Sequence, residues 1–271
     1  MVKESIEEKV EQLEKLVQRT QDALEKKVEQ LNKMVQRTQD VQEIQNVMSR
    51  HCFLHSQGKN HQQVMEIWAL SMPDVSWNNH NQYIMVGPED ILRHYNDPSE
   101  KDKRNMLGRM TKLFPDIPQE LENYQAGSLN MHTNCTPFII VAGDGKTAKG
   151  TWDSPGYWTG LAGNKMQAAW EWVRYAVDFI KIDGKWKIWH FNSFSQFITP
   201  YEESWVTNAL TPKIAEGPQA PEHEVEQKKI SVLRHRSYNP KELCGPLTPN
   251  YPPQPVPYET FSETFSYGPP S

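Results

Sequence analysis

Residues 170–194 read WEWVRYAVDFIKIDGKWKIWHFNSF and contain two runs of β-branched and aromatic residues on either side of Asp183-Gly184. A DG pair between such runs is a strong hairpin signal, because both central residues of a type I′ turn need positive φ. A two-residue turn sets Ile182 opposite Lys185. The stretch therefore predicts two long antiparallel strands on which the rest of the fold is built.

The register of this hairpin predicts which side chains share a face of the sheet. An unbroken ladder pairs Val177 with His190 and Tyr175 with Asn192. Side chains alternate between faces along each strand, so these four residues share one face. Polar groups on a buried face need hydrogen-bond partners or a ligand. We therefore expect Tyr175, His190 and Asn192 to line a site.

Composition excludes several classes of protein. A net charge of −5 without a basic cluster argues against nucleic-acid binding. The longest apolar runs are too short to cross a bilayer, and residues 1–12 lack the apolar core of a signal peptide. Cys52, Cys135 and Cys244 are scattered and lack metal-ligand spacing. We expect a cytoplasmic protein that binds no metal, membrane or nucleic acid.

The N-terminal region contains a tandem repeat. Residues 9–22, KVEQLEKLVQRTQD, recur almost unchanged as residues 27–40, KVEQLNKMVQRTQD. The shift of 18 residues, from 9 to 27, corresponds to about five helical turns, so apolar side chains keep to one stripe of a nearly straight helix. Since no Gly or Pro precedes Gly58, one helix is predicted over residues 5–55. We expect residues 1–40 to form an oligomerisation arm; the alternative is a helix folded back on its own domain.

Residues 41–70 remain helical in pattern, and Gly58 and Asn60 divide them into two helices. His51 and His55 are four residues apart and share one helix face. The motif HCFLH supplies no third metal ligand, which favours a cavity position or ordinary packing over a metal site.

The segment after these helices mixes short elements with loops. Residues 74–87 predict a short strand and turn, and residues 88–96 predict a helix that has Pro88 in its first turn. Residues 97–122 are charged and interrupted by Pro, so they predict a surface excursion, either a lid or a disordered connection.

A second hairpin is predicted between Leu129 and Gly156, where GDGK supplies the turn. Pro137 lies inside its first strand and indicates an edge position or a bulge. His132 lies near the start of this strand. The final segment, residues 212–271, is rich in Pro and carries spaced aromatic residues, so it predicts an extended tail docked on its own domain or on a neighbouring subunit.

The order of these elements resembles the SnoaL-like branch of the NTF2-like superfamily. The matching pieces are VMEIWALSMPDVSW (64–77), YIMVGPEDILRHY (83–95), HTNCTPFIIVAGDGKTAKGTW (132–152) and YAVDFIKIDGKWKIWHF (175–191). The resemblance implies an α+β fold, a cone in which a curved antiparallel sheet encloses a cavity closed by helices, here with a long N-terminal helix and an extended Pro-rich C-terminal tail. We expect an arm over residues 1–40, this domain over 41–200 and the tail over 201–271. The other sheet face often forms a subunit interface, which would suit Trp189 and Phe191.

The resemblance also implies a type of chemistry. Scytalone-dehydratase and bile-acid-dehydratase-like members eliminate water without a cofactor, using His, Tyr, Asp and Asn groups in the cavity. By position in the motif, His132 resembles their strand histidine, and His190 and Asn192 resemble the polar pair of their last strand. Those enzymes usually place a Tyr and an Asp on the first helix. Here His51 lies near the Tyr position and His55 in the Asp region.

The function implied is a cofactor-independent lyase that acts on a hydroxylated aromatic or polycyclic small molecule. His132 would be the general base, because an imidazole titrates near operating pH. Tyr175 and Asn192 would donate hydrogen bonds to developing oxygen charge, and His190 would protonate the leaving group or orient the base. The other candidate site residues are His51, a catalytic candidate, and the substrate-binding candidates His55, Tyr83, Trp152 and Tyr157.

Two other functions use the same features. An isomerase would shuttle a proton with the same cavity groups, and a non-catalytic binding or assembly protein would use the arm and tail to build an oligomer. In each case we expect a homo-oligomer, a dimer or trimer, held by the sheet face, the N-terminal helix and the C-terminal tail.

Overall fold

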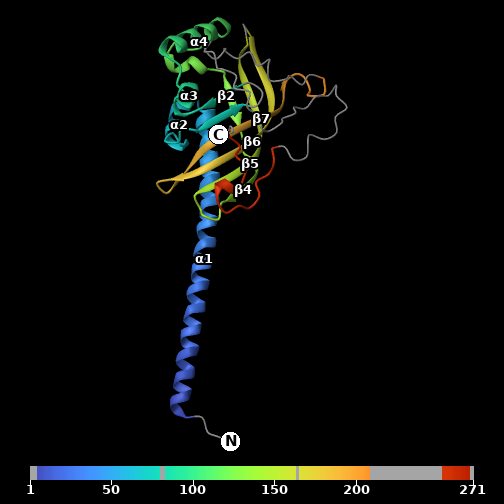
Figure 1. Cartoon of the computed structure of the whole chain (residues 1–271). Coiled ribbons are helices and arrows are strands. Elements are labelled where there is room, and N and C mark those ends of the chain that lie inside the picture. Colours follow the sequence, from blue (N-terminus) through green and yellow to red (C-terminus); the bar gives the residue numbers. More distant parts are fainter. Residues whose placement is uncertain (1–4, 80–82, 163–164, 208–251, 269–271) are drawn as a thin grey trace. The chain divides into compact units, whose positions relative to one another are not determined.

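The structure, a computed structural model, describes residues 5–79, 83–162, 165–207 and 252–268. The chain divides into two compact units, residues 1–42 and residues 43–271. Helix α1 (Ile6–Ser56) begins in the first unit and ends in the second (Figure 1). This confirms the single long helix predicted for residues 5–55.

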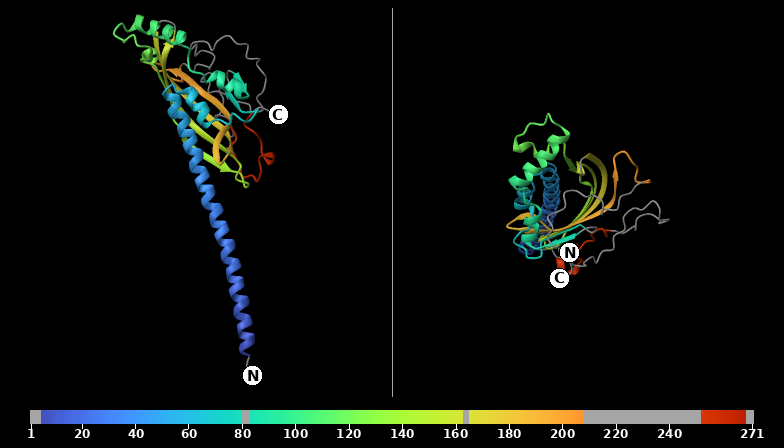
Figure 2. Two further views of the ribbon diagram at one scale, coloured as in Figure 1. Left: turned by 90° about the vertical axis from the view of Figure 1, so that its left-hand side faces the viewer. Right: turned by 90° about the horizontal axis from the view of Figure 1, so that it is seen from above.

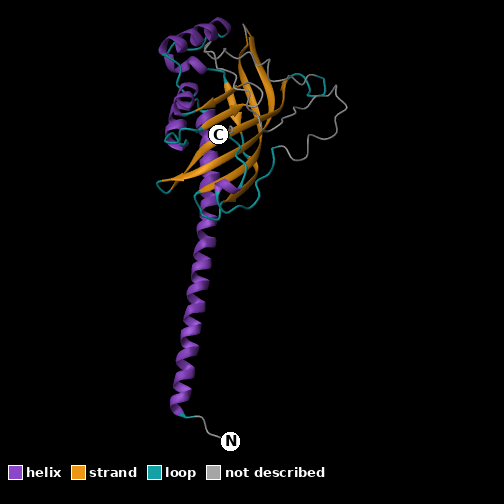
Figure 3. Cartoon of the chain, viewed as in Figure 1, coloured by secondary structure: helices purple, strands orange, loops and turns teal. Residues whose placement is uncertain are grey.

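The second unit contains both helices and strands (Figures 1 and 3). Its other helices are α2 (Asn60–Ile67), α3 (Pro88–His94) and α4 (Glu100–Leu113), with 3-10 turns η1 (Leu121–Gln125) and η3 (Phe261–Glu263). Its strands are β1 (Ser76–Asn79), β2 (Tyr83–Val86), β3 (Leu129–His132), β4 (Cys135–Val141), β5 (Thr147–Ala162), β6 (Lys165–Ile182) and β7 (Lys185–Pro200). The break predicted at Gly58 and Asn60 thus separates α1 from α2.

The strands form one mixed sheet in the order β2-β1-β7-β6-β5-β3, and β4 also pairs with β5. The pairings are antiparallel except that of β1 with β7, which is parallel. Helices α2, α3 and α4 lie along one side of the curved sheet (Figure 2). The α+β fold with a curved sheet and a long N-terminal helix is therefore confirmed.

The hairpin predicted at Asp183-Gly184 forms as expected. Both residues have positive φ, 49° and 73°, and Ile182 faces Lys185. Further from the turn the predicted register is wrong, because a β-bulge separates the Phe179–Ile188 pair from the Asp178–His190 pair. One extra residue on β7, Trp189, has no opposite number on β6, and its indole Nε1 donates to Asp74 Oδ1 over 2.8 Å.

The bulge exchanges the faces of the residues that follow it, because side chains on a strand alternate with a period of two. His190 now lies opposite Asp178 and Asn192 opposite Ala176. We call the sheet face that carries His132, Glu171, Tyr175 and Phe191 the inner face. The opposite face, which carries Lys149, Asp178, His190 and Asn192, is the outer face.

The hydrophobic core lies between the helices and the inner face. Its fully buried side chains include Ile44 and Met48 of α1, Val64 of α2, and Val177 and Phe179 of β6. Burying one such side chain contributes about 1.5–3 kcal/mol relative to leaving it exposed. This core fixes the second-unit part of α1 against the strands and thereby places His51 and His55 over the inner face.

Two local predictions have different outcomes. The bulge expected at Pro137 is present: the pairing of β4 with β5 shifts register between Cys135 and Phe138, and Thr136 has a φ of 48°. Residues 97–122 are not a disordered connection, because they contain α4. Ser99 caps this helix by accepting a hydrogen bond from Asp102 N, and its buried side chains anchor it.

The described part of the tail, residues 252–268, docks on its own domain. Gly143 N donates to Tyr258 O over 2.9 Å, and Tyr258 Oη lies 3.2 Å from Thr147 Oγ1. Tyr267 is 1% exposed and packs with Ala176 and Phe194 of the outer face. Trp189 also meets the tail there, since its ring lies 4.6 Å from that of Phe261. The part of the outer face around Ala176, Trp189 and Phe194 is thus covered by the chain's own C-terminal segment. Phe191, expected at a subunit interface with Trp189, instead lies on the inner face.

Candidate functional site

The inner face brings together residues from three neighbouring strands. His132 of β3 pairs with Gly156 of β5, and Gly156 pairs with Glu171 of β6. Paired residues in adjacent strands project to the same side, so the imidazole of His132 and the carboxyl group of Glu171 meet across Gly156. A Cβ atom at position 156 would lie 2.7 Å from His132 Nδ1, which explains why a glycine separates them.

His132 and Glu171 form an acid–base pair. His132 Nε2 lies 3.9 Å from Glu171 Oε2, and the two side chains are 13% and 22% exposed. A water-sized molecule therefore reaches both groups. His132 Nδ1 is buried and has no hydrogen-bond partner among the residues that the structure describes. Of the two ring nitrogens, Nε2 is the one that faces the carboxyl group.

Burial shifts the pKa values of this pair in opposite directions. It lowers the pKa of His132 to about 3, and the nearby His55 adds to the effect. Burial raises the pKa of Glu171 to about 7. Near neutral pH the imidazole of His132 is therefore neutral, and the expectation that it titrates near operating pH is wrong because of its burial. A large fraction of Glu171 carries a proton at the same pH.

Helix α1 adds two more histidines to the inner face. The rings of His51 and His55 are stacked with centroids 5.9 Å apart, and His55 lies 5.7 Å from His132. The amide of Gln63 donates to His51 Nδ1 over 2.6 Å, and that of Asn130 donates to His55 Nε2 over 2.9 Å. Burial lowers the pKa of both histidines. The three imidazoles can therefore lie close together because all are neutral.

Aromatic side chains surround these polar groups. The Tyr175 ring lies 4.8 Å from Phe191 and 6.4 Å from His132, and Phe191 lies 4.8 Å from His51. Trp152, predicted as a wall residue, is 3% exposed and follows the same alternation on β5. Burial raises the pKa of Tyr175, so its hydroxyl stays protonated and able to donate a hydrogen bond.

The structure does not bring all the predicted residues together. His190 and Asn192 lie on the outer face and cannot reach a ligand held at His132, so the grouping with Tyr175 was wrong because of the Trp189 bulge. Tyr157 also lies on the outer face, where its ring packs 5.0 Å from Trp170 and is 38% exposed. Tyr83 begins β2, and its side chain lies outside the described part of the structure.

His190 belongs to a second polar cluster, on the outer face. Asp178 Oδ2 lies 2.7 Å from His190 Nδ1 and accepts from Ser266 Oγ and Tyr267 N, each over 2.9 Å. Asp178 Oδ1 accepts from Lys149 Nζ over 2.6 Å. Burial alone would lower the pKa of His190, but hydrogen bonds and charge from Asp178 and Asp74 outweigh it and raise that pKa.

This outer cluster joins the tail to the sheet. Ser266 Oγ and Asp178 Oδ2 both contact His190 Nδ1, and Nε2 of the same ring lies 3.5 Å from Asp74 Oδ2. The ammonium of Lys149 is enclosed by three tail rings, with Phe261, Phe265 and Tyr267 centroids 4.8, 4.7 and 4.6 Å away. The cluster therefore holds the tail on the sheet.

Sequence reasoning missed Glu171, Gln63 and Asn130. Glu171 could have been found, because it is four residues before Tyr175 on one strand and so shares its face. Gln63 and Asn130 gave no such signal, since their role depends on how α2 and β3 pack against α1. Within the described residues, no group of three or more His, Cys, Asp or Glu side chains has the arrangement of a metal site. None of the helices described combines the length and apolar character of a membrane span.

Several solved structures are similar to this chain. A hexachlorocyclohexane dehydrochlorinase, LinA type 2, is similar in structure, with 17% identity over 66% of this chain and 99% of its own, and a TM-score of 0.45. LinA type 3 from Novosphingobium barchaimii is similar at 16% identity over 63% of this chain and 95% of its own, also at 0.45. An NTF2-like protein from Novosphingobium aromaticivorans has 14% identity, covers 60% of this chain and 86% of its own, and scores 0.38.

A search of curated proteins found no match. The model of the SnoaL-like domain matches residues 36–192, which is more than half of the 271 residues. This range contains α2, the strands β1 to β6 and half of β7, together with His51, His132 and Glu171. The chain belongs to the SnoaL-like domain family.

Proposed function

We propose that the protein is a cofactor-independent lyase of the dehydratase type, with His132 and Glu171 as its base and acid. One observation carries the proposal: His132 Nε2 and Glu171 Oε2 lie 3.9 Å apart on the inner face. Their pKa values, shifted by burial to about 3 and about 7, give a neutral imidazole beside a carboxyl group that is protonated in about half of the molecules near neutral pH. A fold does not fix a function, so the proposal rests on these groups and not on family membership.

The pair supplies both proton transfers that an elimination needs. His132 Nε2 takes the proton from the carbon next to the hydroxyl-bearing carbon, and the electrons of that C–H bond form the new double bond. Glu171 gives its proton to the hydroxyl group as the C–O bond breaks, and water leaves. A carboxylic acid whose pKa is raised to near operating pH is the usual form of a general acid in a buried site.

The pair is also able to reset itself. After the elimination His132 carries a proton and Glu171 has lost one. The two groups face each other, so the imidazolium can return a proton to the carboxylate directly or through one water molecule. No outside acid or base is required for the next cycle.

The surrounding groups suit a small, uncharged hydroxylated aromatic or polycyclic substrate. Tyr175 stays protonated and would donate a hydrogen bond to a substrate oxygen on which charge develops. His55, held by Asn130, would orient a second polar group. Phe191 and Trp152 supply apolar surface on the same face. A site with three neutral imidazoles lacks a fixed cation, so it does not favour an anionic substrate.

The test is turnover of a panel of hydroxylated aromatic and polycyclic compounds by the purified protein, with product mass as the readout. A lyase yields products lighter by one water, whereas an isomerase, which would use the same pair, yields products of unchanged mass. His132→Gln and Glu171→Gln should each lower turnover about 10²–10⁴-fold, the usual range for one acid–base group.

His61→Gln is the matched control, because His61 is an exposed histidine on α2. It should leave turnover unchanged. Melting temperatures measured on the same samples separate loss of chemistry from loss of folding. A folded His132→Gln protein with normal turnover would overturn the assignment of the base and leave a binding protein as the better account.

A further inference from the structure

The first unit presents a continuous apolar stripe on α1 that is exposed along its whole length. Its members share one side of the helix and are between 48% and 66% exposed. They are Val10, Leu13, Leu16, Val17, Leu24, Val28, Leu31, Met34 and Val35. Isolated exposed apolar residues are common, but a contiguous row of this length marks an interaction surface.

The tandem repeat gives the stripe its regularity. At about 100° per residue, a shift of 18 residues returns a side chain to the same angle on the helix. Val10 and Val28, Leu13 and Leu31, and Val17 and Val35 therefore lie in line. The stripe runs parallel to the axis of a straight helix, so a second straight helix can follow it over both repeats.

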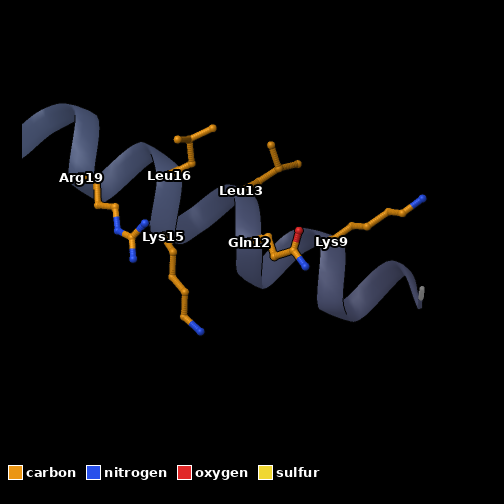
Figure 4. Close-up of a pocket in the computed structure, with 6 residues that line it drawn as sticks. All are labelled: Lys9, Gln12, Leu13, Lys15, Leu16 and Arg19. Atoms are coloured by element: carbon orange, nitrogen blue, oxygen red, sulfur yellow. The ribbon is translucent and has the colours of Figure 1, made fainter.

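The two edges of the stripe carry opposite charge. On one side of the stripe, Lys9 and Lys27 lie between the angular positions of its leucines, and Arg19 and Arg37 lie further round the helix. Glutamates border the other edge: Glu7, Glu14 and Glu25. The angle around the helix axis is counted outward from the centre of the stripe over residues 6–40. To about 130°, the charged residues on one side are all basic and those on the other side are all acidic. Figure 4 shows the first repeat, in which Leu13 and Leu16 project from one side of the helix and Lys15 and Arg19 from the other.

This arrangement of charge selects one way of pairing two copies. When two identical helices lie parallel with their stripes facing, each edge of one meets the opposite edge of the other, so Lys9 of each copy meets Glu14 of the other in the first repeat. When they lie antiparallel, like edges meet, and Lys and Arg would face Lys and Arg. The stripe is thus self-complementary in the parallel orientation alone.

We propose that residues 6–40 of α1 pair with the same residues of a second copy of this chain as a parallel, in-register helical dimer. In such a pair Lys9, just before Val10, faces Glu14 of the partner, just after its Leu13. The proposal is independent of the chemistry proposed for the inner face. The ion pairs Glu11–Lys15 and Glu29–Lys33 lie away from the stripe and support the helix itself.

Light scattering on the full chain tests the pairing. The expected mass is twice the 31.5 kDa of one chain. The double variant Leu13→Glu, Leu31→Glu places two charges in the stripe and should reduce the mass to that of one chain. The control Lys15→Gln, Lys33→Gln changes side chains of similar exposure away from the stripe and should remain dimeric. A monomeric wild-type chain, or a dimer that persists in the leucine variant, overturns the proposal.

Charge exchange tests the orientation. Lys9→Glu and Glu14→Lys each place like charges opposite each other in a parallel homodimer, so each should raise the dissociation constant. Mixing the two variants restores opposite charges on both edges and should favour the heterodimer over either homodimer. In an antiparallel pair these positions do not meet, so mixing would bring no preference, and that result overturns the parallel assignment.

Cysteine cross-linking checks the register. Val10→Cys should form a disulfide-linked dimer under mild oxidation, because the two copies of position 10 face each other across the stripe. Lys15→Cys, on the far side, should cross-link no more than the wild-type chain with its native cysteines. Equal yields from the two variants would rule out the in-register pair.

Discussion

His190 Nδ1 lies 2.7 Å from Asp178 Oδ2 because the bulge at Trp189 turns the imidazole to the outer face of the sheet. The same bulge turns Phe191 to the inner face, where its ring packs 4.8 Å from both Tyr175 and His51. A single extra residue in β7 thus separates a structural cluster, which holds the tail, from the group of residues that we assign to catalysis.

Asp178→Asn should destabilise the fold strongly. Asp178 and Lys149 are both fully buried and 2.6 Å apart, and the variant leaves the ammonium without its counter-ion. Breaking one partner of a buried ion pair costs about 3–5 kcal/mol. Asp153→Asn, which breaks the partly exposed pair with Arg174, should cost less than about 1 kcal/mol. Chemical denaturation measures the free energy of unfolding of both variants. Equal losses would contradict the expectation that the buried Asp178–Lys149 pair matters more to the fold than the partly exposed Asp153–Arg174 pair.

Tyr267→Ala should release the tail from the sheet. Tyr267 is 1% exposed, and its hydroxyl donates to Pro253 O over 2.7 Å. The lost stability cannot exceed the free energy with which the tail docks, because the segment can detach while the domain stays folded. Hydrogen exchange should become faster at Gly143 and Asp144, whose amides donate to tail carbonyl groups. Unchanged exchange at these two amides would show that Tyr267 does not hold the segment.

Stability should depend on pH through Glu171. Its pKa is about 7 in the folded protein, against an ordinary value of 4.5 for an exposed glutamate, so between these values the folded state binds more protons. The free energy of unfolding therefore falls as pH rises through this window, by at most about 3 kcal/mol. Glu171→Gln removes this term, so its stability relative to wild type should increase with pH. His132 is present in both proteins, so its opposite contribution cancels in the comparison. Parallel pH curves for the two proteins would show that Glu171 does not lower stability as pH rises.

The pH profile of turnover should report the same group. As the general acid, Glu171 must be protonated, so turnover should decline as pH rises above about 7. His132 stays neutral down to a pKa of about 3 and so limits activity only in strong acid. The residual turnover of Glu171→Gln should lack the alkaline decline. Turnover that instead rises through pH 7 would identify ionised Glu171 as the active form and reverse its role.

Two glycine substitutions should have opposite effects. An added Cβ at Gly156 would lie 2.7 Å from His132 Nδ1 and 3.3 Å from Met131 O, so Gly156→Ala must displace the imidazole. We expect lower stability and a further loss of turnover. Gly108 lies inside α4 with nothing within 4 Å of the added Cβ, so Gly108→Ala should stabilise by about 0.5–1 kcal/mol. Melting temperatures of the two variants test both expectations. A Gly156→Ala protein with the melting temperature of the wild type would show that the imidazole of His132 can move aside without loss of stability.

The sequence by itself determined the features that depend on neighbouring residues. The absence of Gly and Pro before Gly58 predicts α1, and Asp183-Gly184 predicts the turn because few other pairs adopt positive φ at both positions. Pro137 predicts the bulge of β4 because it cannot donate a ladder hydrogen bond. His51 and His132 both lie near the ring of Tyr175, and none of the three lies beyond the Trp189 bulge.

Only the tertiary structure decided which face His190 and Asn192 occupy and what stands beside His132. Strand side chains alternate with a period of two, so one extra residue at Trp189 reverses every later assignment on β7. That residue is accommodated by contacts with Asp74 and Phe261, which are far away in the chain. Glu171 meets His132 only because Gly156 of a third strand lies between them. Its pKa follows from burial, and burial is a property of the folded molecule and not of the local sequence.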